Sequence, residues 1–312
     1  MTEQLLKSRL KKLTVFLIIT NILILSLGSY AAFLFHRSMR VEIQSKIDME
    51  LREYYKDVLR KVQSDVQSLE TLAGFLEFGG ETDSQKFAQG LQASNDQTSF
   101  ICMSYYNADG SGTHITIDGS ILSDISLSDS SPMVQQTVQT ALQGSIGICD
   151  AHIDDGSGEM VLSYAVPVWD HNEVMGALMA SQSLDTFSYI LDGGVVLSEV
   201  GMVVCINGEG EILAASQRAK NLDCSSIYDW ELGTEHPGFS KLLQNGGNGV
   251  QYFDYYDVPA YIAMRPVNHF EDLYLMVVDT EDSVVGHAYD HMLLSQTIGF
   301  ALMLVSMGCL IW

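Results

Sequence analysis

The stretch LSYAVPVWDHNEVMGALMASQS, residues 162–183, decides the fold that this sequence can adopt. Two runs rich in Val, Ala, Leu and Met flank the polar turn Asp170-His171-Asn172, which is the pattern of two antiparallel strands. A second stretch of the same plan, YIAMRPVNHFEDLYLMVV, occupies residues 261–278. In each stretch a proline, Pro167 or Pro266, is expected to close the first strand. The sequence therefore contains an internal repeat with an offset of about 100 residues.

The elements that precede these two stretches repeat as well. In each copy a strand-like run ends in an Asn- and Gly-containing turn, and a helix opened by proline and ended by glycine lies further on. The paired features are the turns 107–110 and 207–210 and the helices Pro132–Gln143 and Pro237–Gln244. The fold class is therefore α+β, with two successive modules of strand, turn, strand, helix and three further strands in antiparallel sheets.

A long amphipathic helix is predicted over residues 36–79. Apolar side chains recur every three or four residues from Ile43 to Leu76, and Gly79-Gly80 ends the pattern. Such a helix must bury its stripe against the modules, against a second copy of itself, or both. We expect a parallel homodimer in which Tyr55 and Leu59 widen the buried face.

Two uncharged runs flank this region. Residues 13–35 are predicted to form a first transmembrane helix, and residues 283–312 a juxtamembrane helix and a second span from Met292. Four basic residues lie within 1–12, so this N-terminus is expected in the cytoplasm and residues 36–292 outside it, in a multi-pass protein of the cell membrane. A signal peptide cleaved near Ser29-Tyr30-Ala31 is the alternative.

Charge excludes further classes of protein. The chain has a net charge of −23, and residues 36–292 hold 12 basic and 38 acidic residues, a difference of −26. A protein of this charge is not expected to bind nucleic acid, and one with 47% hydrophobic residues is not expected to be disordered. Five cysteines are too few for a disulfide framework, and the pairing of Cys102, Cys149, Cys205 and Cys224 stays open.

In this arrangement the sequence resembles the double Cache (dCache) extracytoplasmic sensor domains of bacterial transmembrane receptors. The local signatures are Asn107-x-Asp109-Gly110, Tyr164-Ala-Val-Pro-Val168 and Val174-Met-Gly-Ala-Leu178. The resemblance implies two PAS-like modules, a membrane-distal one over 80–192 and a membrane-proximal one over 193–282. It also implies a small-molecule ligand in the distal module and a signal carried by the second span to a histidine kinase, diguanylate cyclase or chemoreceptor region.

The amino-acid-binding pattern of that family is largely missing. The distal helix starts Ser131-Pro132-Met133 without the family's arginine and aromatic residues, and Ser181 stands where its amine-binding Asp would fall. Without a bidentate arginine, an α-amino acid is disfavoured as the ligand. The corresponding pocket is expected to be lined by Tyr106, Met133, Asp150, His152, Tyr164 and Ser181, although these residues could instead fill the module core. Asp150 and His152 are expected to share one face of a strand.

Metal sites and enzymatic chemistry are not favoured. The loop 107–118 resembles an EF-hand loop without its first Asp and final Glu, the loop 154–159 reads as a turn, and His287 and His291 lack a third ligand. No cofactor is expected, and no catalytic motif is found in the chain. The leading interpretation is the sensory and membrane portion of a receptor, with a frame that continues past Trp312 into an output domain. The alternative is an anchored binding or adhesion protein without signalling output.

The topology can be tested by cysteine labelling. Ser84→Cys should react with a membrane-impermeant thiol reagent in cells stripped of any outer barrier, whereas Ser8→Cys should react only after the membrane is permeabilised. Labelling of Ser8→Cys alone in intact cells would show the reverse topology.

Overall fold

The computed structural model describes residues 2–79, 100–116, 120–154, 157–193, 201–221, 224–231, 238–255 and 258–280, together with Thr297 and Gly299. The chain divides into two compact units, one formed by Ile47–Asp279 and the other by Met1–Lys46 with Thr280–Trp312. The two modules lie in the first of these units.

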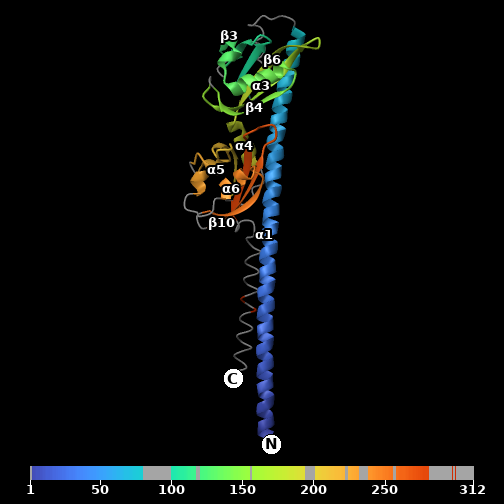
Figure 1. The fold of residues 1–312 in the computed structure, drawn as a ribbon, viewed down its shortest axis with the longest axis vertical. Coiled ribbons are helices and arrows are strands. Elements are labelled where there is room, and N and C mark those ends of the chain that lie inside the picture. Colours follow the sequence, from blue (N-terminus) through green and yellow to red (C-terminus); the bar gives the residue numbers. More distant parts are fainter. Residues whose placement is uncertain are drawn as a thin grey trace. The chain divides into compact units, whose positions relative to one another are not determined.

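A single helix, α1 (Thr2–Gly79), takes in both the predicted first span and the predicted amphipathic helix (Figure 1). Within the described residues, α1 is the helix long and apolar enough to cross a membrane. Apolar side chains from Val15 to Phe33 are mostly exposed on it, for example Phe16 at 67% and Leu27 at 64%. The predicted second span falls almost entirely outside the described residues.

The first module is a six-stranded sheet with the strand order β3-β2-β1-β6-β5-β4. Its elements are β1 (Cys102–Asn107), β2 (Ser111–Ile115), β3 (Ile121–Ser126), η1 (Leu127–Asp129), α3 (Pro132–Leu142), β4 (Gly147–Ile153), β5 (Met160–Asp170) and β6 (Glu173–Ser183). The stretch 162–183 forms the β5–β6 hairpin, with positive φ at His171 and Asn172 in its turn. Pro167 does not close the strand as expected, because β5 continues to Asp170 with a register shift after Val168.

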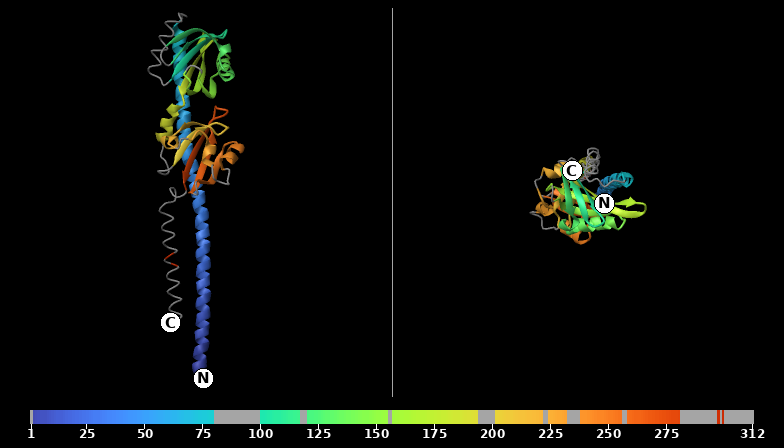
Figure 2. Two further views of the ribbon diagram at one scale, coloured as in Figure 1. Left: turned by 90° about the vertical axis from the view of Figure 1, so that its left-hand side faces the viewer. Right: turned by 90° about the horizontal axis from the view of Figure 1, so that it is seen from above.

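The second module is a five-stranded sheet with the order β8-β7-β11-β10-β9, which repeats the order of the first module without β3. Its elements are α4 (Asp185–Gly193), β7 (Met202–Ile206), β8 (Ile212–Ala215), α5 (Gln217–Lys220), η2 (Ile227–Glu231), α6 (Gly238–Gln244), β9 (Gly249–Tyr255), β10 (Val258–Pro266) and β11 (Tyr274–Thr280). Figure 2 shows both sheets from a second direction. The predicted helices before Gly144 and before Gly246-Gly247 are confirmed as α3 and α6.

The repeat extends to individual backbone hydrogen bonds. Gly110 and Gly210 both have φ of 84°, and their carbonyl oxygens accept from Leu127 N at 2.8 Å and Ile227 N at 2.9 Å. Ser111 pairs with Ser126 in the first module, and Glu211 with Ser226 in the second. In the second module this pairing is one isolated bridge, whereas in the first it belongs to the additional strand β3. The predicted five strands are therefore one too few for the first module. Strand β3 has no buried residue and lacks a strict alternation of apolar residues, so its sequence does not show the pattern of a strand.

The apolar stripe of α1 is buried within the chain. Its members between Ile47 and Ala73 are at most 9% exposed, namely Ile47, Leu51, Tyr54, Val58, Val62, Val66, Leu69 and Ala73. Lys61 Nζ donates to Gln182 Oε1 of β6 at 2.9 Å, and Arg265 of β10 lies 3.4 Å from Asp48 of α1. The stripe therefore serves both modules, and a dimer through α1 would need its more polar faces.

A largely buried ion pair lies within α1 where Lys61 also contacts Gln182 of the first sheet. Asp65 is 5% exposed and is paired with Lys61, while its second carboxylate oxygen has no hydrogen-bond partner. Burial raises the pKa of Asp65, so the charged form depends on Lys61 for its stabilisation.

Removing one partner of this pair should therefore be costly. We expect Lys61→Met to lower the free energy of unfolding by about 3 kcal/mol, because it leaves Asp65 buried without a counter-charge. The matched control Arg60→Met breaks the exposed pair with Asp57 and should cost less than about 1 kcal/mol. The double variant Lys61→Met/Asp65→Leu should regain most of the loss in denaturant unfolding followed by circular dichroism. Equal effects of Lys61→Met and Arg60→Met would contradict this account.

Candidate functional site

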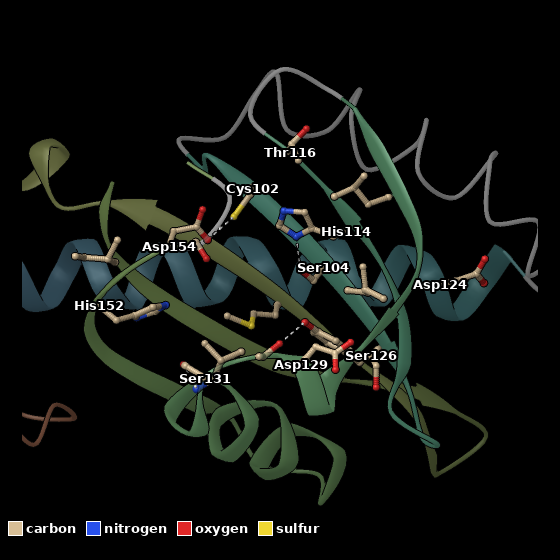
Figure 3. Close-up of a pocket in the computed structure, with 18 residues that line it drawn as sticks. Cys102, Ser104, His114, Thr116, Asp124, Ser126, Asp129, Ser131, His152 and Asp154 are labelled. Carbon is tan, nitrogen blue, oxygen red and sulfur yellow. Dashed lines mark hydrogen bonds between the residues drawn. The ribbon is translucent and has the colours of Figure 1, made fainter. Parts of the chain in front are cut away.

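A cavity of about 490 Å³ lies on one face of the first sheet, beside the N-terminus of α3. Figure 3 shows the sheet between this cavity and α1. One face of the sheet therefore lines the cavity and the other packs against the helix. Alternate residues of β1 and β6 form the floor, since side chains two apart on a strand share a face. The floor residues are Cys102, Ser104 and Tyr106 of β1 and Met179 and Ser181 of β6.

A hydrogen-bonded group of polar side chains lines one end of the cavity. Ser104 Oγ lies 2.8 Å from His114 Nδ1, across the β1–β2 pairing. Cys102 Sγ donates to Asp154 Oδ1 at 3.7 Å, and Asp154 Oδ2 accepts from the backbone and the hydroxyl of Ser157. Burial raises the pKa of Cys102 to about 12, so its thiol stays protonated. This end of the cavity presents a neutral thiol, a hydroxyl, an imidazole and a carboxylate (Figure 3).

His152 enters the cavity through a β-bulge in β4. Cys149 pairs with Ser163 and His152 with Val161, so three steps along β4 match two along β5. His152 Nδ1 donates to the carbonyl oxygen of Asp150 at 2.9 Å, because a carbonyl can only accept. In the neutral ring Nε2 is then an acceptor, and it lies 3.5 Å from Ser163 Oγ.

Of the six residues expected at the pocket, Tyr106, His152 and Ser181 line this cavity. Tyr164 does not, because Ser163 pairs with Ser181 and puts its own hydroxyl on the cavity side, 2.8 Å from Ser181 Oγ. Tyr164, the next residue, therefore points to the opposite face, where it is fully buried and feels the charge of Asp65 on α1.

Met133 and Asp150 also lie outside the cavity. The buried face of α3 is Val134, Thr137, Val138 and Ala141, so Met133 is one residue out of phase and 42% exposed. Asp150 follows Cys149, which pairs with Ser163 on the cavity side, so it points to the opposite side, where Asp150 Oδ1 accepts from Glu271 N at 2.9 Å. The expectation that Asp150 and His152 share a face is wrong, because the extra residue breaks the alternation.

Several lining residues were not anticipated. Ser104 and Cys102 precede Tyr106 by two and four residues on the same strand, so alternation alone could have found them. His114 follows from the hairpin pairing set by the turn at 107–110. Asp124, Asp129 and Asp154 lie in β3, in the short helix η1 and in the loop after β4, where no sequence period predicts the direction of a side chain.

The electrostatic character of the cavity is acidic. Among the described residues that line it, Asp124, Asp129 and Asp154 are carboxylates and none is Lys or Arg. Ser131 Oγ accepts from Val134 N and so occupies one donor at the N-terminus of α3. A ligand carboxylate would find no side-chain counter-charge among these residues, whereas a cation or a donor-rich neutral molecule would find acceptors.

The residues of the candidate metal patterns that the structure describes make hydrogen bonds within turns. Within the described residues, no group of three or more His, Cys, Asp or Glu side chains is placed to hold a metal ion. Asp109 accepts from Ser111 in the β1–β2 turn, and Asp154 holds the turn to Ser157. His287 and His291 lie outside the described residues. Among the described cysteines, Cys102, Cys149, Cys205 and Cys224, no disulfide is formed.

The corresponding place in the second module is filled by apolar side chains. At an offset of 100 residues, Cys102, Ser104 and Tyr106 of β1 correspond to Met202, Val204 and Ile206 of β7. These three pack with Phe239 and Phe253 in the core of the second module. A separate hollow of about 360 Å³ lies beside β8 and α5, where Lys220 pairs with Asp185 at 2.9 Å.

Three groups of solved structures share this architecture. The ligand-binding domain of the Campylobacter jejuni chemoreceptor Tlp3, in complex with 4-methylisoleucine, is 12% identical with a TM-score of 0.62 and matches over 80% of this chain and 95% of that one. The Pseudomonas aeruginosa PAO1 receptor PctC with GABA is 15% identical, with a TM-score of 0.54 over 76% of this chain and 99% of that one. The Pseudomonas fluorescens receptor CtaA with L-isoleucine is 15% identical, with a TM-score of 0.55 over 82% and 99%. No sequence-family profile matches the chain, and no curated protein matches it significantly in sequence.

The protonation of His114 should make the first module sensitive to acid. Burial lowers the pKa of His114 from 6.5, an effect that the charge of Asp154 partly offsets. The folded module therefore favours the neutral ring, and the unfolded chain takes up the proton first as the pH falls below about 6.5. The stability contributed by His114 is complete above that pH and is lost as the pH falls towards the folded-state pKa.

We expect His114→Gln to destabilise the protein by about 1 kcal/mol near pH 7.5, through the lost contact with Ser104, and by less near pH 5. Thermal unfolding across this pH range provides the measurement. The control His171→Gln alters a ring whose side chain is 97% exposed and should change the stability by less than about 0.5 kcal/mol. A His114→Gln effect that grows on acidification would contradict the expected sign.

Proposed function

We propose that this chain, which has the double Cache fold of chemoreceptor sensory domains, is the ligand-sensing portion of a bacterial transmembrane receptor and binds a small molecule in the distal module. The observation that carries the proposal is the contrast between the modules. The distal module encloses about 490 Å³ with convergent polar groups, while the matching place in the proximal module is filled. The module limits are proposed as 80–192 and 193–282.

The ligand is proposed to lack a carboxylate and to donate hydrogen bonds or carry positive charge. The named structures hold amino acids or GABA, but the described lining of this cavity offers acidic groups and no guanidinium or ammonium. Asp154 is the best-placed anionic contact, since it shares one end of the cavity with His114 and Cys102 (Figure 3). It replaces Asp150, whose carboxylate lies outside the cavity and accepts from Glu271 N.

The membrane arrangement supports a receptor. The exposed apolar surface of α1 between Val15 and Phe33 suits a span, and the same helix continues to Gly79 through the part that packs against both modules. In this proposal the second span, from about Met292, transmits a ligand-dependent shift between two arrangements to a cytoplasmic output domain. The receptor acts as a parallel dimer.

The ligand class can be tested with the full chain in lipid nanodiscs. A thermal-shift screen should compare amines, hydroxylated compounds and nucleobases with L-isoleucine and GABA. The best hit should bind ten- to a hundredfold more weakly to Asp154→Asn, which loses a charge-assisted contact. The control Asp170→Asn changes an exposed carboxylate in the β5–β6 turn and should bind normally. Strong stabilisation by L-isoleucine or GABA that Asp154→Asn leaves unchanged would contradict the proposed class.

A further inference from the structure

Asp150 joins the distal module to the proximal one. Its Oδ1 accepts from Glu271 N at 2.9 Å, and the backbone N–H groups of Glu271 and Asp272 both favour its charged form. Asp150 belongs to β4 of the first sheet, whereas Glu271 and Asp272 lie in the loop between β10 and β11 of the second. This contact is a specific hydrogen bond across a sequence separation of 121 residues.

Asp150 also accepts a hydrogen bond from a residue that lines the cavity. His152, which lines the cavity, donates from Nδ1 to the carbonyl oxygen of Asp150 at 2.9 Å. Asp150 and Ala151 form the bulge, where the β4–β5 ladder shifts register. The extra residue of a bulge is unpaired and the ladder is locally disrupted there, so the bulge can change its geometry without breaking the regular ladder bonds on either side. A change in the position of the His152 ring can therefore reach Asp150 without disturbing the rest of the sheet.

The loop that receives Asp150 is itself held on two other sides. Asn268 N lies 3.4 Å from Tyr55 Oη of α1, and Asp272 Oδ1 accepts from Gly208 N at 2.6 Å in the β7–β8 turn. His269 adopts a φ of 79°, so the loop has a defined and constrained backbone. A displacement of Glu271 would thus be passed to α1 and to the second sheet rather than absorbed locally.

The contact is weak enough to be switched. Burial and the carboxylates of Glu271 and Asp272 disfavour the charge of Asp150 and raise its pKa, while the two backbone N–H donors lower it. Among the ion pairs of the described residues, none joins Asp150 to a lysine or an arginine. Both Glu271 and Asp272 are exposed, so water competes for the same donors. Contacts of this kind open at low free-energy cost.

We propose that the bulge Asp150–Ala151 is the joint through which the state of the distal cavity acts on the proximal module. Asp150 is a positioning residue: its carbonyl oxygen holds His152 at the cavity, and its carboxylate holds the loop 268–272. Occupation of the cavity at His152 alters this bulge and so the contact with Glu271. This inference rests on the proposed function in assigning the cavity to a ligand, but the mechanical link itself needs no ligand to be measured.

The link can be tested by hydrogen–deuterium exchange on the full chain in lipid nanodiscs. Asp150→Ala should raise the exchange rates of the Glu271 and Asp272 amides about tenfold, because their acceptor is lost. Asp150→Asn retains an acceptor oxygen and should stay within about threefold of the unmodified chain. The decisive variant is His152→Ala, at a residue that lines the distal cavity. It should raise the exchange rates of the same two amides by about threefold or more.

His114→Ala is the matched control, because it removes an imidazole from the same cavity but from β2, where its contact is Ser104. It should leave the exchange rates of the Glu271 and Asp272 amides unchanged. The amide of Met276, a buried residue of β11, should remain protected in all variants, which separates a local effect from unfolding. If the bulge also acts in the opposite direction, Asp150→Ala should shift the ¹⁵N resonances of the His152 ring, whereas Asp150→Asn should leave them near their original positions.

If the exchange rates of these amides increase with Asp150→Ala but not with His152→Ala, the proposed link is overturned. Asp150 would then be a structural contact between the modules that does not respond to the cavity. Equal increases with His152→Ala and His114→Ala would also overturn it, because the effect would then be general loosening of the module. The two proposals fail separately. If the ligand screen yields no hit but His152→Ala alters the exchange rates of the loop amides, the proposed function is contradicted and the proposed link is supported.

Discussion

Burial of one apolar stripe on α1 is the constraint on which the two modules depend. From Ile47 to Ala73 this stripe is almost completely withdrawn from solvent, and a helix of this length with that stripe exposed would be poorly soluble. Both sheets contribute to its burial, as the contacts of Gln182 with Lys61 and of Arg265 with Asp48 show. The two modules pack against one continuous helix. A structural change in either module therefore alters contacts with the same element, α1.

The two modules show how one backbone plan accepts two different interiors. Apart from β3, the strand order is the same in both, as are the glycine turns and the hydrogen bonds to Gly110 and Gly210. These are main-chain interactions and are largely indifferent to the side chains between them. Small polar side chains such as Ser104 leave a hollow where Val204 and its neighbours leave none. A function on this fold therefore lies in a few side chains, as is general for folds that recur with different sites.

The hairpin β5–β6 connects the cavity with α1 because a strand presents alternate residues to its two faces. Ser163 and Ser181 face the cavity, while Tyr164 and Gln182, each the next residue along its strand, face α1. Strand β4 makes a second connection through its bulge, this one to the proximal module. A ligand at the floor of the cavity would therefore lie one peptide unit away from groups that contact the helix.

The sequence by itself determined the elements and their order. The repeat of about 100 residues, the helices beginning at proline and ending before glycine, the hairpin 162–183 and the long helix all follow from local periodicity and capping, which act within a few residues. The positions of Tyr106 and Ser181 at the cavity could be reached in the same way, whereas His152 reaches the cavity only through the bulge in β4. The tertiary structure decided the face of Tyr164, the outward direction of Asp150, the helical phase of Met133 and the presence of β3. The physical reason is that strand register and bulges are set by pairing with distant segments, and a shift of one residue moves a side chain to the opposite face of the sheet.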